Sequence, residues 1–239
     1  MNPLLLLHAF PLDHRMWAEV ESLLPGGPRI LTPDIPGALV HQAPSLDAIA
    51  DAAADQLRAA GIDRAVVGGL SMGGYVALAL LERHPDLVAS LALIDTKSTA
   101  DAPEAYANRL RVADEVERTG SVDPVRPMSG VLLGETTRTL RPQITAVVDG
   151  WIGEQDPASV AWCQRAMAAR PDRTEVLRAF DGAVRVVVGD EDGLTPVAAA
   201  EHMVEAARYA RLVVVPRAGH LTAIEDPATV ATALGELLA

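Results

Sequence analysis

Groups that could cross-link the chain or bind a metal ion are scarce in the sequence. Its 239 residues include one cysteine, Cys163, so no disulfide bond can form within the chain. A single thiol fits the reducing cytosol, and we expect a cytoplasmic protein. The sequence has no H-x-x-x-H or H-E-x-x-H motif, no G-x-G-x-x-G and no Walker-type loop. We therefore expect no metal site and no nucleotide cofactor.

Positive charge and long apolar runs are also in short supply. Lys and Arg number 20 against 32 Asp and Glu, a net charge of −12, which argues against binding to nucleic acid or to an anionic membrane surface. No apolar run approaches the roughly 20 residues needed to span a bilayer. The run from Leu4 to Leu7 lacks the basic segment that precedes a signal-peptide core, so we expect it to be a buried strand. The expected partner is a small molecule, and assembly as a homodimer stays open.

The sequence does contain a regular alternation of short apolar runs with helix-length segments. A chain of 239 residues suits one domain with an insertion. Six runs are expected to form strands: residues 4–8, 29–32, 65–69, 89–94, 184–188 and 211–215. Runs such as Val186-Val187-Val188 are apolar throughout, which is typical of strands covered on both faces of a parallel sheet. The pattern predicts an α/β fold with about six mostly parallel strands flanked by helices.

Capping residues mark several of the expected helices. A helix expected over residues 46–60 follows Ser45 and ends at Gly61. Thr195 and Asp226 are each expected to cap a further helix, because each is followed by a proline suited to the first helical position.

Residues 97–180 break the alternation, because they contain no strand-like run. Proline-separated helical patterns cover residues 104–118, 139–152, 158–169 and 174–180. We therefore expect a helical cap at 97–180, inserted into a core made of residues 1–96 and 181–239. The inserted segment holds 11 of the 20 basic residues but only 12 of the 32 acidic ones, so it is nearly neutral on a strongly acidic body.

The most informative segment is Gly69-Leu70-Ser71-Met72-Gly73, which lies between a buried apolar run and an amphipathic helix. A G-x-S-x-G pattern between a strand and a helix predicts a nucleophile elbow, a sharp turn with the serine at its apex. Glycines two residues before and after Ser71 avoid a collision with the neighbouring backbone. The helix that follows points free N–H groups at the serine, so we expect Ser71 to be a nucleophile.

A serine nucleophile needs a base within hydrogen-bond reach and a third group to orient that base. Of six histidines, we expect His220 to be the base, because it follows a late strand and would project over the carboxyl ends of the strands. The acid is expected after the preceding strand, where Asp192 lies deepest in the loop. Asp190 in the same loop and Asp95 at the end of the fourth strand stay open as alternatives.

Acyl transfer at a serine also requires hydrogen-bond donors for the developing oxyanion. The backbone N–H of Met72, at the start of the elbow helix, is one candidate. The second is the N–H of Phe10, in the loop after the first strand. His8 in that loop is expected to be structural, since His220 already supplies the base.

Taken together, these segments resemble the α/β-hydrolase superfamily over nearly the whole chain, and are most similar to its 3-oxoadipate enol-lactonase and carboxylesterase group. The resemblance rests on Leu7-His8-Ala9-Phe10-Pro11-Leu12-Asp13, Asp34-Ile35-Pro36-Gly37, Gly69-Leu70-Ser71-Met72-Gly73-Gly74, Leu93-Ile94-Asp95-Thr96, Gly189-Asp190-Glu191-Asp192 and Gly219-His220. It implies a catalytic triad of Ser71, Asp192 and His220, oxyanion donors at Phe10 and Met72, and a helical cap over the pocket.

The sequence departs from the family pattern at three places. Ala9 stands where the family usually has glycine. After Pro36-Gly37 the chain continues as Ala38-Leu39-Val40-His41, where the family usually reads x-G-x-S. The family's N-terminal antiparallel hairpin is absent, so six strands are expected where larger members have eight.

The resemblance implies a serine hydrolase that cleaves a small carboxylic ester or lactone through an acyl-enzyme. A cofactor-free perhydrolase or haloperoxidase, a C–C bond hydrolase with the same triad, and a non-catalytic ligand-binding member are the alternatives. Trp151 and Trp162 are expected either to line the substrate pocket or to form the core of the cap. The arginines of the cap would suit an anionic substrate, or else are solvated and paired with local acids.

Overall fold

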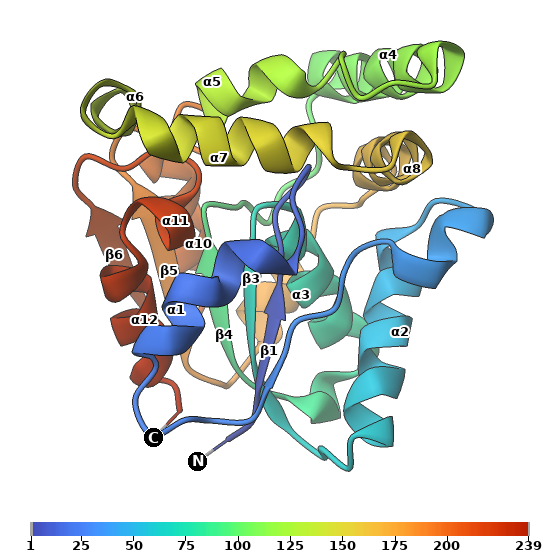
Figure 1. Ribbon diagram of the computed structural model, residues 1–239. Coiled ribbons are helices and arrows are strands. Elements are labelled where there is room, and N and C mark those ends of the chain that lie inside the picture. The colour runs from blue at the N-terminus through green and yellow to red at the C-terminus, as the bar shows by residue number, and fades with distance from the viewer. Residues whose placement is uncertain (1, 239) are drawn as a thin grey trace.

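The computed structural model describes residues 2–238 and contains a single parallel β-sheet at its centre (Figure 1). Six strands follow one another in the order β2-β1-β3-β4-β5-β6, and every neighbouring pair is parallel. Their bounds are β1 Leu4–Leu7, β2 Ile30–Leu31, β3 Ala65–Leu70, β4 Val88–Ile94, β5 Val184–Gly189 and β6 Ala210–Val215. The six predicted strands are therefore confirmed, each within two residues of its expected ends.

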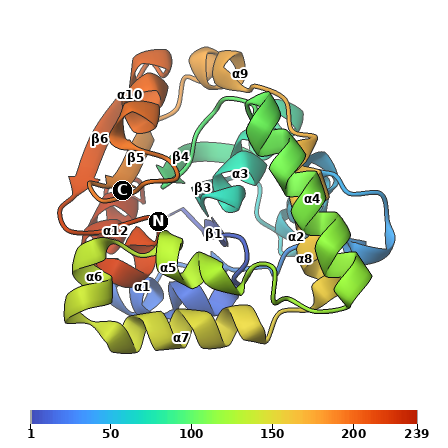
Figure 2. The same cartoon turned by 90° about the horizontal axis from the view of Figure 1, so that it is seen from above.

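Helices cover both faces of the sheet, which explains why its central strands are apolar on both sides. Figure 2 shows α1 and α12 on one face, and α2, α3, α9 and α10 on the other. Their bounds are α1 Ala18–Leu23, α2 Leu46–Ala59, α3 Met72–Arg83, α9 Thr174–Ala179, α10 Val197–Ala206, α11 Thr222–Glu225 and α12 Pro227–Gly235. All residues of β1, β3 and β5 are buried between these layers.

A third layer of helices lies across the carboxyl ends of the strands (Figure 1). We call it the helical layer; it consists of α4 Pro103–Thr119, α5 Ser129–Leu132, α6 Glu135–Leu140, α7 Pro142–Gly153 and α8 Pro157–Ala168. These helices come from the chain between β4 and β5, as does α9, which lies beside α10. The strand register pairs Leu7 with Gly69 and Gly69 with Leu93, so β1, β3 and β4 end together beneath this layer.

Two of the three predicted capping residues behave as expected. The Ser45 hydroxyl accepts a hydrogen bond from Ala48 N at 3.3 Å at the start of α2, and the Asp226 carboxylate accepts one from Thr229 N at 3.1 Å at the start of α12. The prediction for Thr195 is wrong: α10 begins at Val197, and the Thr195 hydroxyl donates to Asp192 instead.

The prediction of one continuous helix over residues 139–152 is also wrong. This segment is divided between α6 and α7, because Arg141 leaves the helical region with φ −134° and ψ 56°. A residue before proline disfavours the helical conformation, and Pro142 instead begins α7. Among residues 2–238, none of the helices combines the length and the apolar character that crossing a bilayer requires.

Candidate active site

Ser71 sits at the junction between β3 and α3 with an unusual backbone conformation. Its φ is 54° and its ψ is −111°, a combination that costs conformational energy for a residue with a side chain. The chain passes so close to its neighbours here that a Cβ at Gly73 would lie 1.9 Å from Leu7 O, and one at Gly69 would lie 2.2 Å from Gly73 O. The glycines thus allow β1, β3 and α3 to meet at the serine.

This close approach predicts a severe effect for Gly73→Ala. The new methyl group would overlap backbone atoms of β1 that cannot move aside, so we expect the free energy of unfolding to fall by at least about 3 kcal/mol. Thermal or urea unfolding followed by circular dichroism measures the change. Gly150→Ala is the matched control: nothing lies within 4 Å of its new Cβ in α7, and it should stabilise the protein by about 0.5–1 kcal/mol. Equal stabilities of the two variants would contradict this account of the turn.

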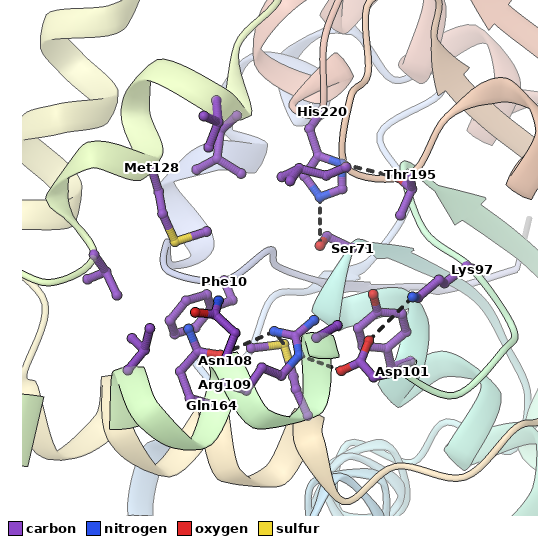
Figure 3. Close-up of a pocket in the computed structure, with 18 of the residues that line it drawn as sticks. Phe10, Ser71, Lys97, Asp101, Asn108, Arg109, Met128, Gln164, Thr195 and His220 are labelled. Carbon is purple, nitrogen blue, oxygen red and sulfur yellow. Dashed lines mark hydrogen bonds and ion pairs between the residues drawn. The ribbon is translucent and has the colours of Figure 1, made fainter. Parts of the chain in front are cut away.

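Two hydrogen bonds connect Ser71, His220 and Asp192 (Figure 3 shows the first two residues). His220 Nε2 lies 2.8 Å from Ser71 Oγ, and His220 Nδ1 lies 2.7 Å from Asp192 Oδ2. All three side chains are largely buried, from loops that follow β3, β5 and β6. The structure therefore brings together the three residues that the sequence selects as candidate nucleophile, base and acid.

Asp192 is held by a turn of its own loop. Its Oδ1 accepts hydrogen bonds from Leu194 N at 2.8 Å and Thr195 N at 3.0 Å, and its Oδ2 accepts one from Thr195 Oγ1 at 2.7 Å. Thr195 Oγ1 also lies 3.2 Å from His220 Nδ1. Thr195 was predicted to cap a helix instead; an Asp followed by Thr three residues later is the signal that could have identified this turn.

Neither alternative acid is bonded to His220. Asp190 is exposed and accepts a hydrogen bond from Arg217 N. Asp95 is fully buried and accepts from Gly189 N at 3.2 Å, and from Thr222 N and Oγ1 at 2.9 and 2.7 Å. Asp95 thus connects the loops that carry Asp192 and His220, and burial raises its pKa to about 7.

Glu225 is a third buried carboxylate at this site, and it was not predicted from the sequence. Its Oε1 accepts hydrogen bonds from Gly219 N at 2.9 Å and Leu221 N at 3.2 Å, the residues on either side of His220. Its Oε2 accepts from Gly134 N at 2.9 Å in the helical layer. Glu225 therefore fixes the backbone that carries the imidazole, and the sequence around it contains no motif that indicates this.

The charges around His220 set its protonation equilibrium. Burial disfavours the imidazolium, but the hydrogen bond and charge of Asp192, with the charges of Asp95 and Glu225, outweigh burial and raise the pKa of His220 above its ordinary value. Burial likewise opposes ionisation of Asp192, yet the hydrogen bond and charge of His220 lower the pKa of that carboxyl. The two side chains therefore stabilise each other's charged forms.

The two predicted oxyanion donors are the amides of Phe10 and Met72. Within residues 2–238 neither amide donates a backbone hydrogen bond to a protein acceptor, and Phe10 lines the same cavity as Ser71. His8 is structural in its contacts, because Nδ1 lies 3.0 Å from Ala9 O and Nε2 accepts from Ile35 N at 2.8 Å. Burial lowers the pKa of His8, as expected for a neutral imidazole that orders the loop.

A cavity of about 440 Å³ opens beside Ser71 and His220, under the helical layer. Its apolar walls come from both the sheet end and the helical layer, with contributions from Phe10, Val112, Val125, Met128, Leu132 and Met167. Trp151 and Trp162 do not line it, so their predicted contact with this pocket is not found. Trp162 is buried with Nε1 donating to Gln42 O at 2.9 Å, and Trp151 stacks against Arg15.

One group of side chains in the described part of the chain could place three ligands around a metal ion. It consists of Asp13, His14 and Asp34, two of which are exposed. His14 Nδ1 lies 2.8 Å from Asp34 Oδ1, and Asp13 is bonded to Arg15, so these residues already have partners. None of them lines the cavity at Ser71.

The chain is similar to known proteins over almost its whole length. The family model of the alpha/beta hydrolase fold matches residues 2–227. A pimeloyl-[acyl-carrier protein] methyl ester esterase from Aromatoleum aromaticum is 30% identical, over 94% of this chain and 93% of that protein.

Solved structures give the same result. A thermophilic esterase from Thermogutta terrifontis, determined with malate bound, is 36% identical with a TM-score of 0.94, covering 100% of this chain and 89% of that one. An enol-lactonase from Burkholderia xenovorans shares the fold, with a TM-score of 0.85 at 23% identity, over 100% of this chain and 92% of that one. The chain thus belongs to the family of the α/β-hydrolase fold.

Proposed function

We propose that this protein is a serine hydrolase that cleaves a small carboxylic ester or lactone through an acyl-enzyme, with Ser71 as nucleophile, His220 as base and Asp192 as acid. The observation that carries the proposal is the pair of hydrogen bonds from Ser71 Oγ through His220 to Asp192, at 2.8 and 2.7 Å. Ester hydrolysis also agrees with the esterases to which the chain is similar.

In the first half of the reaction, Ser71 Oγ attacks the carbonyl carbon of the substrate and its proton passes to His220 Nε2. The amides of Phe10 and Met72 donate to the oxyanion of the tetrahedral intermediate. When the C–O bond to the leaving alcohol breaks, the oxygen takes the proton from His220. Asp192 accepts a hydrogen bond from Nδ1 throughout and stabilises the imidazolium.

In the second half, His220 removes a proton from a water molecule that attacks the acyl-enzyme. The second tetrahedral intermediate collapses, Ser71 regains its proton and the carboxylic acid leaves. Water is the co-substrate, and the mechanism requires no cofactor. Residues 97–180 act as a cap, since this segment supplies Val112, Val125 and Met128 to the cavity wall.

The pH dependence of ester hydrolysis tests this assignment. Protonated His220 cannot accept the Ser71 proton, so kcat/KM must fall as the pH drops through the pKa of His220. Because that pKa is raised above 6.5, we expect half-maximal kcat/KM for p-nitrophenyl acetate and butyrate above pH 6.5 in the wild-type protein.

Asp192→Asn provides the comparison for the pH profile. It removes the carboxylate that raises the pKa of His220, so the midpoint of its residual activity should move to lower pH. A midpoint that is unchanged by Asp192→Asn, or a wild-type rate independent of pH, would contradict a general-base role for His220.

A further inference from the structure

The charged side chains around the cavity have an unexpected sign for so acidic a protein. The chain carries a net charge of −12, yet the charged residues that line the cavity are Lys97, Arg109 and Arg111 against Asp101 alone, apart from His220. Arg111 is exposed and paired with Glu115. The excess of positive charge therefore lies with Lys97 and Arg109.

Asp101 does not neutralise these two cations, because a third one already pairs with it. Arg170 donates through both terminal nitrogens to the two oxygens of Asp101, at 2.7 and 2.8 Å. Arg109 Nε adds a contact of 2.6 Å and Lys97 Nζ one of 3.3 Å. Three cations thus share one carboxylate whose side chain is only 2% exposed, and the cluster keeps two excess positive charges.

Both excess cations retain N–H groups for a ligand. Arg109 Nη1 reaches Gln164 Oε1 at 3.2 Å, whereas its Nη2 has no hydrogen-bond acceptor within residues 2–238. Lys97 Nζ makes one ion pair, with Asp101, and can donate to two further acceptors. Figure 3 shows the two head groups on either side of Asp101, with Ser71 between them and His220.

The environment distinguishes these side chains from two other arginines of the inserted segment, Arg165 and Arg126. Arg165 pairs with Asp114 and Glu117, and Arg126 pairs with Asp149, so each of these half-buried cations has at least one acid of its own. Those pairs match one of the two alternatives expected from the sequence, in which the arginines of the cap pair with local acids. The side chains of Lys97 and Arg109 are only 25% and 21% exposed, and partly buried charge without a counter-ion is costly.

We propose that Lys97 and Arg109 form a subsite for a carboxylate of the substrate, so that the esters or lactones cleaved at Ser71 carry a second, free carboxylate group. This inference rests on the proposed function. The bound carboxylate supplies the missing negative charge, and apolar side chains such as Val125 and Met128 in the same cavity can contact the hydrocarbon part of the substrate. Paired donation from a lysine and an arginine is well suited to a carboxylate.

The test compares kcat/KM for the monomethyl esters of succinate, glutarate and adipate with their uncharged counterparts, in which a carboxamide replaces the free carboxylate. We expect the wild-type protein to prefer the best anionic ester by about 10- to 100-fold. Acetoxyacetate and its amide place the charge on the alcohol side, and so show which part of the substrate enters the subsite.

Variants of Lys97 and Arg109 test whether these two residues cause the preference for anionic esters. Lys97→Met and Arg109→Met should each lower the ratio of anionic to amide kcat/KM by about tenfold, whereas Lys97→Arg keeps most of it. Arg118→Gln, at a 71% exposed position of the same helix α4, is the control and leaves the ratio unchanged. Because the ratio is taken within one variant, a loss of folded protein does not alter it.

The outcomes separate the two proposals. The subsite is overturned if the wild-type protein has equal kcat/KM for anionic and amide esters, whichever side of the ester bond carries the charge. It is also overturned if the ratio of anionic to amide kcat/KM is unchanged in both methionine variants. Either result would leave the proposed serine hydrolase activity intact. If the wild-type protein hydrolyses no ester, the proposed function fails, and calorimetric titration with glutarate decides the subsite: binding that weakens about tenfold in Lys97→Met supports it, and no wild-type binding overturns it.

Discussion

Alanine at position 71 is expected to lower kcat for p-nitrophenyl acetate by roughly 10⁴- to 10⁶-fold. In the proposed mechanism the variant removes the atom that forms the acyl-enzyme, while the proposed oxyanion donors and the cavity remain and account for the residual rate. Ser71 is buried, and its loss removes one hydrogen bond, to His220 Nε2. Steady-state kinetics with protein free of contaminating esterases measure the effect.

Ser90→Ala is the matched control for Ser71→Ala. Ser90 is also a buried serine, in β4, and its hydroxyl has no hydrogen-bond partner within the described residues. Its removal should therefore leave kcat within about twofold and the stability unchanged or slightly higher. Similar rates for Ser71→Ala and Ser90→Ala would place the reaction somewhere other than the elbow.

The second large effect is expected for Asp192→Asn, with a loss of roughly 10⁴-fold in kcat. The amide replaces a carboxylate that accepts from His220 Nδ1 at 2.7 Å. An NH₂ group at that position would favour the tautomer with the proton on Nε2, which cannot accept the Ser71 proton, and the imidazolium would lose its counter-charge. The geometry is retained because asparagine has the same shape.

Two further variants discriminate among the acids that the sequence left open. Asp190→Asn alters an exposed side chain bonded to Arg217 N and should change kcat by no more than about twofold. Asp95→Asn removes a buried acceptor that connects two loops, so we expect a smaller loss than for Asp192→Asn. A larger loss in either variant than in Asp192→Asn would assign the acid to that residue.

The parts of this fold that could be predicted are those that local sequence dictates. Apolar runs without alternation indicated the central strands, and the two close approaches at Gly69 and Gly73 require glycine whatever lies around them. Ser71 and His220 could be chosen because a parallel sheet brings the ends of its strands to one edge. Ser45 and Asp226 follow from capping chemistry that depends on three or four neighbouring residues.

What could not be predicted depends on contacts between distant segments. Glu225 bonds to residue 134 in the helical layer, and Asp101 gathers Lys97, Arg109 and Arg170 from three parts of the chain. The spacing of apolar residues along the sequence does not indicate such contacts. Trp151 and Trp162 were candidates for the pocket because of their residue type alone, and the packing of the helical layer instead places both outside the cavity at Ser71.

Covalent labelling by a fluorophosphonate, read out by intact-protein and peptide mass spectrometry, tests the central claim most directly. A serine activated by His220 displaces the leaving group and retains the phosphonyl group, whereas an ordinary serine does not react at neutral pH. The account predicts one adduct per chain, located on Ser71, with no labelling of Ser71→Ala and undiminished labelling of Ser90→Ala. An adduct on another residue, or no adduct on folded wild-type protein, would contradict it.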